Sequence, residues 1–310
     1  MKSVQPTISL ALFGLAVGLA VKPIGDEPTP VPFYTVDLDQ PEEKRWDHII
    51  KEYAEDVKYV QKIMRFKGGS RFGRACTSIV SEDVNGQIWH ARNMDYGFSD
   101  KVRNVTIGVH FQTGGLTMYS AITFVGYVGV LTGQKPHGYT ITVDQRDQGN
   151  WWMNLLIGLL DHNALPVSLL VRDTLAYFKD FESAIENLAQ TDTVAPAYFI
   201  IGGVHQHQGV VVTKSRIGAD DFWYIGAEKN YSNWFLVETN YDHWEPAPTS
   251  DDRRHAAIKA MMVMGRQQIS VQNLFNVIST PLVKNKKTIY SVVMSAAQPS
   301  LMKAWVRYPE

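Results

Sequence analysis

Residues 74–80 read RACTSIV, and residues 89–96 read WHARNMDY. The dipeptide Asn85-Gly86 lies between these two apolar runs. Asn-Gly is the strongest short-range signal for a β-hairpin, because a tight two-residue turn needs positive φ at both central positions. We therefore predict a strand that starts at Cys76, a turn at the Asn-Gly pair and a return strand over residues 87–94.

The predicted hairpin brings a thiol, a guanidinium and a carboxylate together at one end, on Cys76, Arg92 and Asp95. Cys76 is the only cysteine of the chain. If the chain is cut between Ala75 and Cys76, the freed α-amine, with a reference pKa of about 7.7 to 8.0, can accept the thiol proton. Nucleophile and base would then belong to one residue, and Arg92 and Asp95 could hold the amine.

Residue type alone favours plainer explanations of the same three side chains. A lone cysteine is more often a small buried apolar residue than a nucleophile. Arg92 and Asp95 could form an ordinary salt bridge on the hairpin. Catalysis by Cys76 is therefore a hypothesis that the rest of the sequence has to support.

Composition limits the classes of protein that the chain can belong to. Its 310 residues, 45% of them hydrophobic, can bury a full core as one large domain or two closely packed pieces. The formal net charge of -1 gives no electrostatic case for binding nucleic acid. A single cysteine rules out an internal disulfide. The nine histidines show no zinc-type spacing beyond His205-Gln206-His207, so we expect no metal site.

The N-terminal residues have the pattern of a targeting segment. Lys2 precedes an apolar run over residues 8–21. A membrane-spanning helix needs about 20 apolar residues, so the run predicts a cleaved signal peptide over residues 1–20, with an uncleaved anchor as the alternative. Two glycosylation sequons, at Asn104 and Asn230, fit the same secretory route.

The segment before the cysteine contains three predicted parts. Prolines make residues 22–32 an extended linker, and residues 33–39 form a short strand. From Pro41 to about Phe66 the apolar residues fall near helical spacing, which predicts one amphipathic helix. We expect its apolar stripe to pack on the rest of the protein, with a membrane or lipid surface as the alternative.

The sequence after the hairpin predicts runs of strands that are separated from runs of helices. Strands are expected at 105–112, 116–124, 139–143, 198–203, 209–214, 222–225, 234–239, 288–295 and 303–308, and helices at 151–160, 166–178, 180–188, 251–264 and 271–278. Residues 113–115 read as a turn, and the strands between 198 and 239 are expected to form a second sheet. This order indicates an α+β fold in which two sheets pack together with helices outside.

Several motifs of this chain are similar to those of one enzyme family. Residues 76–80 (CTSIV) and 90–96 (HARNMDY) resemble the start of the catalytic chain in the acid amidase and acid ceramidase family of N-terminal-nucleophile hydrolases. Similar motifs follow in the same order at 124–129 (FVGYVG), 132–134 (TGQ), 149–152 (GNWW), 201–203 (IGG), 237–244 (VETNYDHW), 246–248 (PAP), 251–254 (DDRR) and 293–296 (VMSA). The resemblance covers nearly everything after Cys76.

The resemblance implies a fold, a maturation step and a reaction. The expected fold is the four-layer αββα sandwich of N-terminal-nucleophile hydrolases. Cleavage before Cys76 would give a small chain, residues 21–75, and a catalytic chain, residues 76–310, which remain together as a heterodimer. The expected activity is hydrolysis of lipid amides, N-acylethanolamines above all, in the lysosome or outside the cell, without a cofactor and with possible contact to a membrane surface. Ceramide hydrolysis, or lipid binding by an inactive relative, are the alternatives.

The family also implies roles for individual residues. By resemblance, Asn240 donates a side-chain N–H to the oxyanion, Arg92 and Asp95 orient the amine of Cys76, and Arg253 supports them. Without the family, Asn240 would more simply shape a turn. Arg253 would be a solvated charge at the start of a helix.

Three features depart from the family pattern. Residues 67–74 are a flexible basic stretch, and the segment before Cys76 is shorter than in relatives, where it includes apolar helices that meet lipid; a trypsin-type protease could also cut here. Gln145 stands where the family has a glutamate near the nucleophile. Leu131 stands where the amidase has tryptophan and the ceramidase has leucine. We place both in the substrate pocket and expect altered pH response and selectivity.

The exchange at residue 145 gives a first prediction. Glutamine keeps the shape of glutamate but does not titrate. We expect a flat or neutral pH profile for amide hydrolysis by the wild type, and an acid profile for Gln145→Glu. A profile that does not change in the variant would show that residue 145 does not set the pH optimum.

Overall fold

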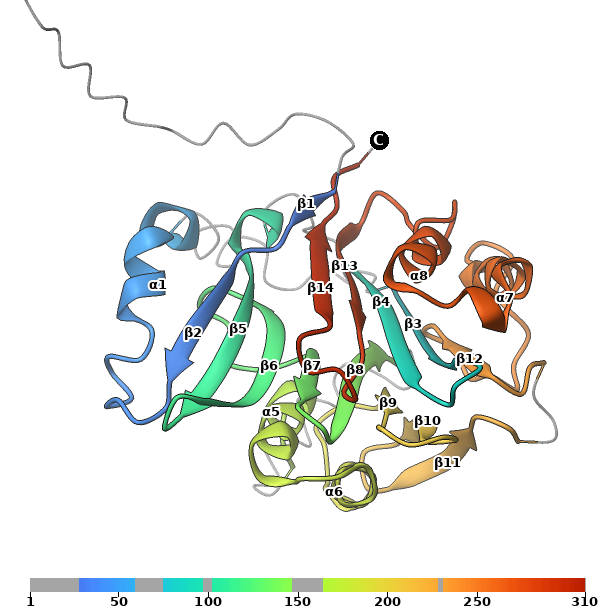
Figure 1. The fold of residues 1–310 in the computed structure, drawn as a ribbon, viewed down its shortest axis with the longest axis horizontal. Helices are drawn as coiled ribbons and strands as arrows, with labels where there is room; N and C mark the ends of the chain where they lie inside the picture. Colours follow the sequence, from blue (N-terminus) through green and yellow to red (C-terminus); the bar gives the residue numbers. More distant parts are fainter. Residues whose placement is uncertain (1–27, 59–74, 97–101, 147–163, 228–230, 310) are drawn as a thin grey trace, which may run out of the picture.

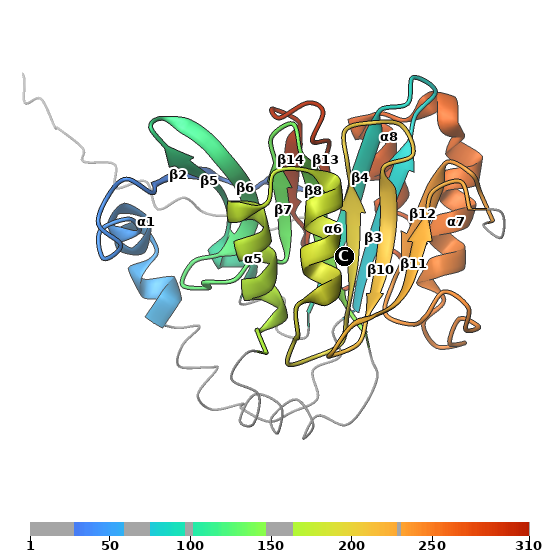
Figure 2. The same cartoon turned by 90° about the horizontal axis from the view of Figure 1, so that it is seen from below.

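The computed structural model describes residues 28–58, 75–96, 102–146, 164–227 and 231–309. Two β-sheets pack against each other, and helices cover both outer faces (Figures 1 and 2). The layers therefore follow the order helix, sheet, sheet, helix, which is the α+β sandwich expected from the sequence. No helix among these residues is long and apolar enough to cross a membrane.

The first sheet has six strands, all paired antiparallel. Its order is β1 (Thr29–Pro30), β14 (Met302–Val306), β13 (Thr288–Met294), β4 (Ile88–Asp95), β3 (Ala75–Glu82) and β12 (Phe235–Glu238). Helices α7 (Arg253–Met264) and α8 (Val271–Ile278) cover its outer face (Figure 1). Buried Ala257, Met261, Leu274 and Val277 of these helices pack on apolar residues of the sheet such as Phe235.

The second sheet has eight strands. Its order is β11 (Ala219–Tyr224), β10 (Gly209–Lys214), β9 (Ala197–Gly202), β8 (Tyr139–Gln145), β7 (Thr132–Lys135), β6 (Leu116–Phe124), β5 (Thr106–Thr113) and β2 (Phe33–Asp37). Only the pair β2 and β5 is parallel. Helices α5 (Val167–Tyr177) and α6 (Phe181–Gln190) lie on its outer face (Figure 2).

The sequence explains where α6 begins and which of its faces packs on the sheet. Asp180 precedes the helix, and its side chain accepts the N–H of Ser183 (2.9 Å), which satisfies a donor that the first turn leaves open. Buried Phe181, Ile185 and Leu188 recur at helical spacing and form the stripe that packs inward. Three further short elements are α1 (Asp47–Glu52) and the 3-10 helices η1 (Arg103–Val105) and η2 (Arg266–Gln268).

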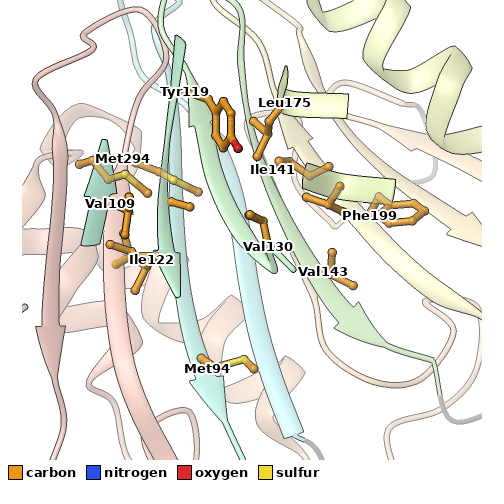
Figure 3. Close-up of a cluster of buried hydrophobic side chains, with 14 of the residues drawn as sticks. Met94, Val109, Tyr119, Ile122, Val130, Ile141, Val143, Leu175, Phe199 and Met294 are labelled. Carbon is orange, nitrogen blue, oxygen red and sulfur yellow. The ribbon is translucent and has the colours of Figure 1, made fainter. Parts of the chain in front are cut away.

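The largest apolar core joins the two sheets and the helices α5 and α6. Figure 3 shows part of this cluster, in which Met294 of β13 lies with Val109 and Ile122 of the second sheet. On the far side of β8, Ile141 lies with Leu175 of α5 in the same cluster. Alternate residues of β8 therefore pack on opposite sides of the strand, Ile141 toward α5 and Asp144 toward the six-stranded sheet.

The β3–β4 hairpin forms as predicted, but its turn differs. Gly86 has a φ of 80°, whereas Asn85 does not have positive φ. Asp83 donates its N–H to the carbonyl of Gln87 (3.0 Å), so the loop contains three residues. The Asp83 carboxylate accepts the N–H groups of Asn85 (2.9 Å) and Gln87 (3.0 Å), which stabilises this geometry. The prediction of two positive φ values is therefore wrong here, although the turn between β5 and β6 has them at Gly114 and Gly115.

The single helix predicted from Pro41 to Phe66 is also wrong within the described part of the chain. Helix α1 starts at Asp47 and ends at Glu52, and helical geometry resumes over residues 54–58. At the break, Tyr53 packs beside Tyr34, whose hydroxyl donates to it (3.2 Å). The apolar stripe packs on the main core, as expected. Residues 59–66, like the helix predicted at 151–160 and the signal peptide at 1–20, lie outside the described residues.

The strands between 198 and 239 do not form a sheet of their own. Strand β9 pairs with β8, so β9, β10 and β11 extend the sheet that already contains β5 to β8. Strand β12 instead pairs with β3 in the other sheet. The short strands β1 and β7 were not predicted. A buried apolar run identifies a strand, but it carries no information about which strand pairs with it.

The segment before Cys76 contributes an edge strand to each sheet. Strand β1 pairs with β14, and β2 pairs with β5 along five residues. The Phe33 ring of β2 lies over Gly108 of β5, where a Cβ would approach it to 2.5 Å. Only glycine therefore allows this close packing.

The contact between Phe33 and Gly108 gives the second prediction. Gly108→Ala should lower the free energy of unfolding by about 1 to 3 kcal/mol, because the ring must move out of a close-packed site. The measurement is thermal or urea unfolding of the wild type and the variant. Gly218→Ala is the matched control, because no atom lies within 4 Å of a Cβ built there. Equal effects of the two substitutions would contradict the prediction.

Candidate active site

The register of β3 and β4 decides which side chains meet at Cys76. Cys76 lies opposite Met94, and Ser78 lies opposite Arg92. Because alternate residues of a strand share a face, these four side chains point to the same side of the sheet. That side faces β8 of the other sheet, since Ser78 donates a hydrogen bond to Asp144 of β8 (2.9 Å).

The Cys76 thiol is buried and lies beside a guanidinium. Cys76 is only 3% exposed. Arg92 Nη2 donates to Sγ of Cys76 (3.4 Å), and Sγ lies 3.7 Å from Sδ of Met94. Burial raises the pKa of the thiol, whereas the positive charge of Arg92 lowers it. The ionisation of the thiol therefore depends on how much of the Arg92 charge it senses.

Backbone carbonyl groups of β8 and of the loop that precedes β7 hold Arg92 in place. Nη2 donates to the carbonyl of Val143 (2.6 Å), and Nη1 donates to the carbonyl of Leu131 and the hydroxyl of Thr132. The carboxylate nearest to Arg92 in the described chain is Asp144, at 3.7 Å from Nη2. The alternative explanation, an ordinary salt bridge between Arg92 and Asp95, is therefore wrong.

Asn240 and Arg253 bind the backbone of Cys76 and contact each other. The N–H of Cys76 donates to Oδ1 of Asn240 (2.8 Å), and Arg253 Nη2 donates to the same oxygen (2.9 Å). Arg253 Nη1 donates to the carbonyl of Cys76 and to the hydroxyl of Thr77 (3.3 Å). Nδ2 of Asn240 donates to the carbonyl of Gln145 (2.7 Å). In this arrangement Asn240 binds the backbone nitrogen of Cys76 with its oxygen.

The plainer explanations of these two residues account for only part of the geometry. Asp252 does cap α7, since its side chain accepts the N–H of His255 (3.2 Å). Arg253, however, is buried and is not a solvated charge. The Asp251 carboxylate accepts from its Nε (2.6 Å) and Nη2 (2.8 Å), which fixes the guanidinium toward Cys76.

Asp95 lies across the strand pair from Ala75, next to the peptide bond proposed to be cut. The carboxylate is fully buried, and Asn285 donates to Oδ2 (2.7 Å). Oδ1 has no hydrogen-bond partner among the residues that the structure describes. Burial raises the pKa of Asp95 to about 6, against the opposing effect of Arg253. A carboxylate oxygen that lacks a donor is suited to a new amine.

The other residues singled out from sequence have different positions. Leu131 and Gln145 adjoin the site through the carbonyl groups that accept from Arg92 and Asn240. Asn104 is half-buried in η1, and Asn230 lies outside the described residues. Within the described ranges, no group of three or more His, Cys, Asp and Glu side chains could hold a metal ion.

The structure adds buried polar residues that the sequence analysis missed. Thr140, Thr142 and Asp144 alternate along β8 and face the six-stranded sheet, where His90 lies between the two threonine hydroxyls (2.9 and 3.0 Å). Burial lowers the pKa of His90 to about 3, so the imidazole is neutral. The alternation of polar residues within a strand was the available signal, because a strand buried on both faces is normally apolar throughout.

Glu238 of β12 is a second missed residue. It lies opposite Ser78 and is fully buried. Oε1 accepts the N–H of Thr239 (2.7 Å), and Oε2 has no hydrogen-bond partner within the described part of the protein. Burial raises the pKa of Glu238 to about 8, so the side chain holds its proton at neutral pH.

Comparison with known proteins agrees with this site. The model of the linear amide C–N hydrolases, choloylglycine hydrolase family, matches residues 76–265 and so begins at Cys76. A second model, the beta subunit of N-acylethanolamine-hydrolyzing acid amidase, matches residues 29–85. The chain belongs to the choloylglycine hydrolase family of linear amide C–N hydrolases.

Individual relatives make the comparison more specific. The N-acylethanolamine-hydrolyzing acid amidase of Rattus norvegicus is 47% identical over 235 residues, which cover 76% of this chain and 64% of that protein. The acid ceramidase of Macaca fascicularis is 28% identical, with 87% and 84% covered. The chain thus spans less than two thirds of the curated amidase.

A solved structure supports the fold as well. The Caenorhabditis elegans N-acylethanolamine-hydrolyzing acid amidase ortholog superposes with a TM-score of 0.67 at 35% sequence identity, covering 74% of this chain and 99% of that one. The resemblance stated from the sequence motifs and the expected sandwich of an N-terminal-nucleophile hydrolase are both confirmed.

Glu238 gives the third prediction. Its folded pKa of about 8 lies above the unfolded value of about 4.3, so the folded state binds the proton more tightly between these pH values. Stability that is present at acid pH is therefore lost as the pH rises toward 8. Between pH 4 and pH 7, the Glu238 carboxyl should lower the free energy of unfolding by on the order of 3 kcal/mol.

Glu238→Gln should remove this part of the pH dependence, because the amide has the shape of the protonated acid. The measurement is urea unfolding at several pH values from 4 to 7. Glu186→Gln, the same exchange at an exposed position of α6, is the control. Identical slopes of unfolding free energy against pH for the wild type and Glu238→Gln would contradict the assignment.

Proposed function

We propose that this protein is a cysteine amidase that hydrolyses fatty-acid amides such as N-acylethanolamines to a free fatty acid and ethanolamine. It would become active when the chain is cut between Ala75 and Cys76. One observation carries the proposal: Arg92, Asn240 and Arg253 contact the thiol, the nitrogen and the carbonyl of the same residue, Cys76. The similarity to curated amidases supports the choice of substrate.

Maturation follows from chemistry at one peptide bond. The Cys76 thiolate attacks the carbonyl carbon of Ala75, and the C–N bond breaks as the nitrogen takes up a proton, which leaves a thioester. Water then hydrolyses the thioester and frees the thiol and the α-amine. Asp95 lies beside this bond and would accept the new ammonium group at its open oxygen.

Hydrolysis of the substrate would reuse the same groups. The α-amine takes the thiol proton, and the thiolate attacks the acyl carbon of the lipid amide. The negative oxygen of the tetrahedral intermediate needs donors, and Asn240 Nδ2 would supply one by leaving the Gln145 carbonyl. Arg253 would hold Asn240 through its oxygen. The α-amine then gives the proton to the amide nitrogen, the C–N bond breaks, and ethanolamine leaves. Water hydrolyses the thioester on Cys76 and releases the fatty acid.

The two chains of the cut protein are proposed to stay together as a heterodimer. The small chain, residues 21–75, includes β1 and β2, which pair with β14 and β5 of the catalytic chain, residues 76–310. No cofactor is required, because nucleophile, base and oxyanion donor are protein groups. We place the enzyme in the lysosome or the secretory route on the strength of the residue 1–20 pattern and its acid amidase relatives, with contact to a membrane surface for substrate entry.

Ceramide hydrolysis is the second candidate. Leu131, whose carbonyl binds Arg92, has the residue type of the ceramidase at that position. The similarity to acid ceramidase extends over more of the chain than the similarity to the amidases, though at lower identity.

The fourth prediction tests maturation and substrate together. The full-length protein and Cys76→Ala are expressed, incubated at acid and neutral pH, and analysed by intact mass and N-terminal sequencing. We expect two chains in the wild type, the larger beginning at Cys76, and one chain in the variant. The processed protein should release palmitate from palmitoyl-ethanolamide faster than from ceramide.

Other outcomes would select an alternative. Cleavage of wild type and variant alike would assign the cut to a separate protease. A chain that stays whole and releases no fatty acid would favour an inactive lipid-binding relative. Faster hydrolysis of ceramide would replace the amidase assignment with the ceramidase one.

A further inference from the structure

A continuous line of polar side chains crosses the space between the two sheets and ends at Cys76. His90 contacts Thr142 (3.0 Å), and the hydroxyl of Thr142 donates to Ser78 (2.9 Å). Ser78 donates to Oδ1 of Asp144 (2.9 Å), which lies 3.7 Å from Arg92 Nη2. Arg92 Nη2 in turn donates to the Cys76 thiol. The line therefore connects a carboxylate to the thiol through one guanidinium.

Asp144 occupies a position in this line that its hydrogen bonds do not explain. The side chain is fully buried, and Oδ2 has no hydrogen-bond partner in the described part of the chain. Arg92 is bound by backbone carbonyl groups, including that of Val143, so Asp144 is not needed to hold it in place. What Asp144 adds is a possible negative charge close to the guanidinium.

We propose that Asp144 is a positioning residue that acts through Arg92: when Asp144 is charged, it offsets Arg92 and makes the Cys76 thiol harder to ionise. The proposal rests on the proposed function, in which Cys76 is the nucleophile. It identifies the titrating carboxyl beside the nucleophile in a chain that has glutamine at position 145.

The direction of the effect follows from simple electrostatics. Burial raises the pKa of Asp144 to about 7, against the opposing effects of Arg92 and the Ser78 hydrogen bond. Below that pH the carboxyl is neutral, and the thiol senses the whole charge of Arg92. Above it, the negative charge of Asp144 raises the pKa of the thiol. The balance between thiol and thiolate therefore responds to pH near neutrality.

Other charged and titratable groups act electrostatically on Asp144. Besides the thiol itself, they are Arg92 and Asp95 on β4, Glu238 on β12, Tyr290 on β13 and Arg253 on α7. Arg92, Asp95, Tyr290 and Arg253 also act on the thiol, so the test has to separate them from Asp144.

The fifth prediction measures the thiol directly. Cys76 is the only cysteine, so alkylation by iodoacetamide, followed by intact mass from pH 5 to 9, reports on this thiol alone. Asp144→Asn keeps the acceptor for Ser78 and removes the charge. We expect its thiol to be labelled about tenfold faster than that of the wild type at pH 8, which corresponds to a thiol pKa lower by about one unit. Asp173→Asn, at an ion pair with Arg172 on α5, is the matched control and should label like the wild type.

A second variant separates charge from structure. Ser78→Ala keeps the Asp144 carboxyl but removes its donor, which shifts the ionisation of Asp144 and the break in the labelling profile to higher pH. A purely structural role would change the labelling rate by the same factor at every pH without moving the break. If Asp144→Asn melts below the assay temperature, Ser78→Ala alone decides the question.

Two results would overturn the proposal. They are a folded Asp144→Asn protein whose thiol titrates like that of the wild type, and a Ser78→Ala protein whose break does not move. Labelling needs no turnover. A protein that neither cleaves itself nor hydrolyses amides, but still shows the shifted titration, would refute the proposed function and leave the role of Asp144 intact.

Discussion

The burial of the Arg92 guanidinium is the constraint on which the rest of the site depends. A charged group without solvent is costly unless its donors find partners, and here the carbonyls of Leu131 and Val143 accept from Nη1 and Nη2, whereas Nε has no partner among the described residues. Val143 lies in β8 of the opposite sheet and Leu131 directly precedes β7, so the charge ties the two sheets together. The thiol of Cys76 receives its electrostatic surroundings as a by-product of that connection.

The sequence was sufficient for the parts of the fold that local chemistry determines. The β3–β4 hairpin, the helices α5 to α8 and the convergence of Cys76 with Arg92 follow from periodicity, turn residues and register. Strand partners did not follow, because β9 and β12 have equally buried patterns and join different sheets. The prediction of the turn type was wrong for a related reason, because hydrogen bonds to the side chain of Asp83 stabilise the three-residue loop.

The site shows the same division between local and distant information. Family motifs named Asn240 and Arg253, and the structure brings both to Cys76 although each lies more than 160 residues away in the chain. Asp144 and Glu238 were not found, because a buried acid in a strand has no meaning until its neighbours are known. Their burial places a polar cluster between the two sheets beside the apolar core, where the facing sheets of sandwiches normally pack side chains of their inner faces together.

The two short strands before Cys76 close one end of each sheet, β1 beside β14 and β2 beside β5. An open strand edge presents unpaired N–H and C=O groups that can pair with another molecule. If the backbone is cut before Cys76 as proposed, only non-covalent contacts would keep these edges covered. Loss of the small chain would therefore expose two templates for edge-to-edge association, so that aggregation, rather than a soluble inactive enzyme, is the natural end of dissociation.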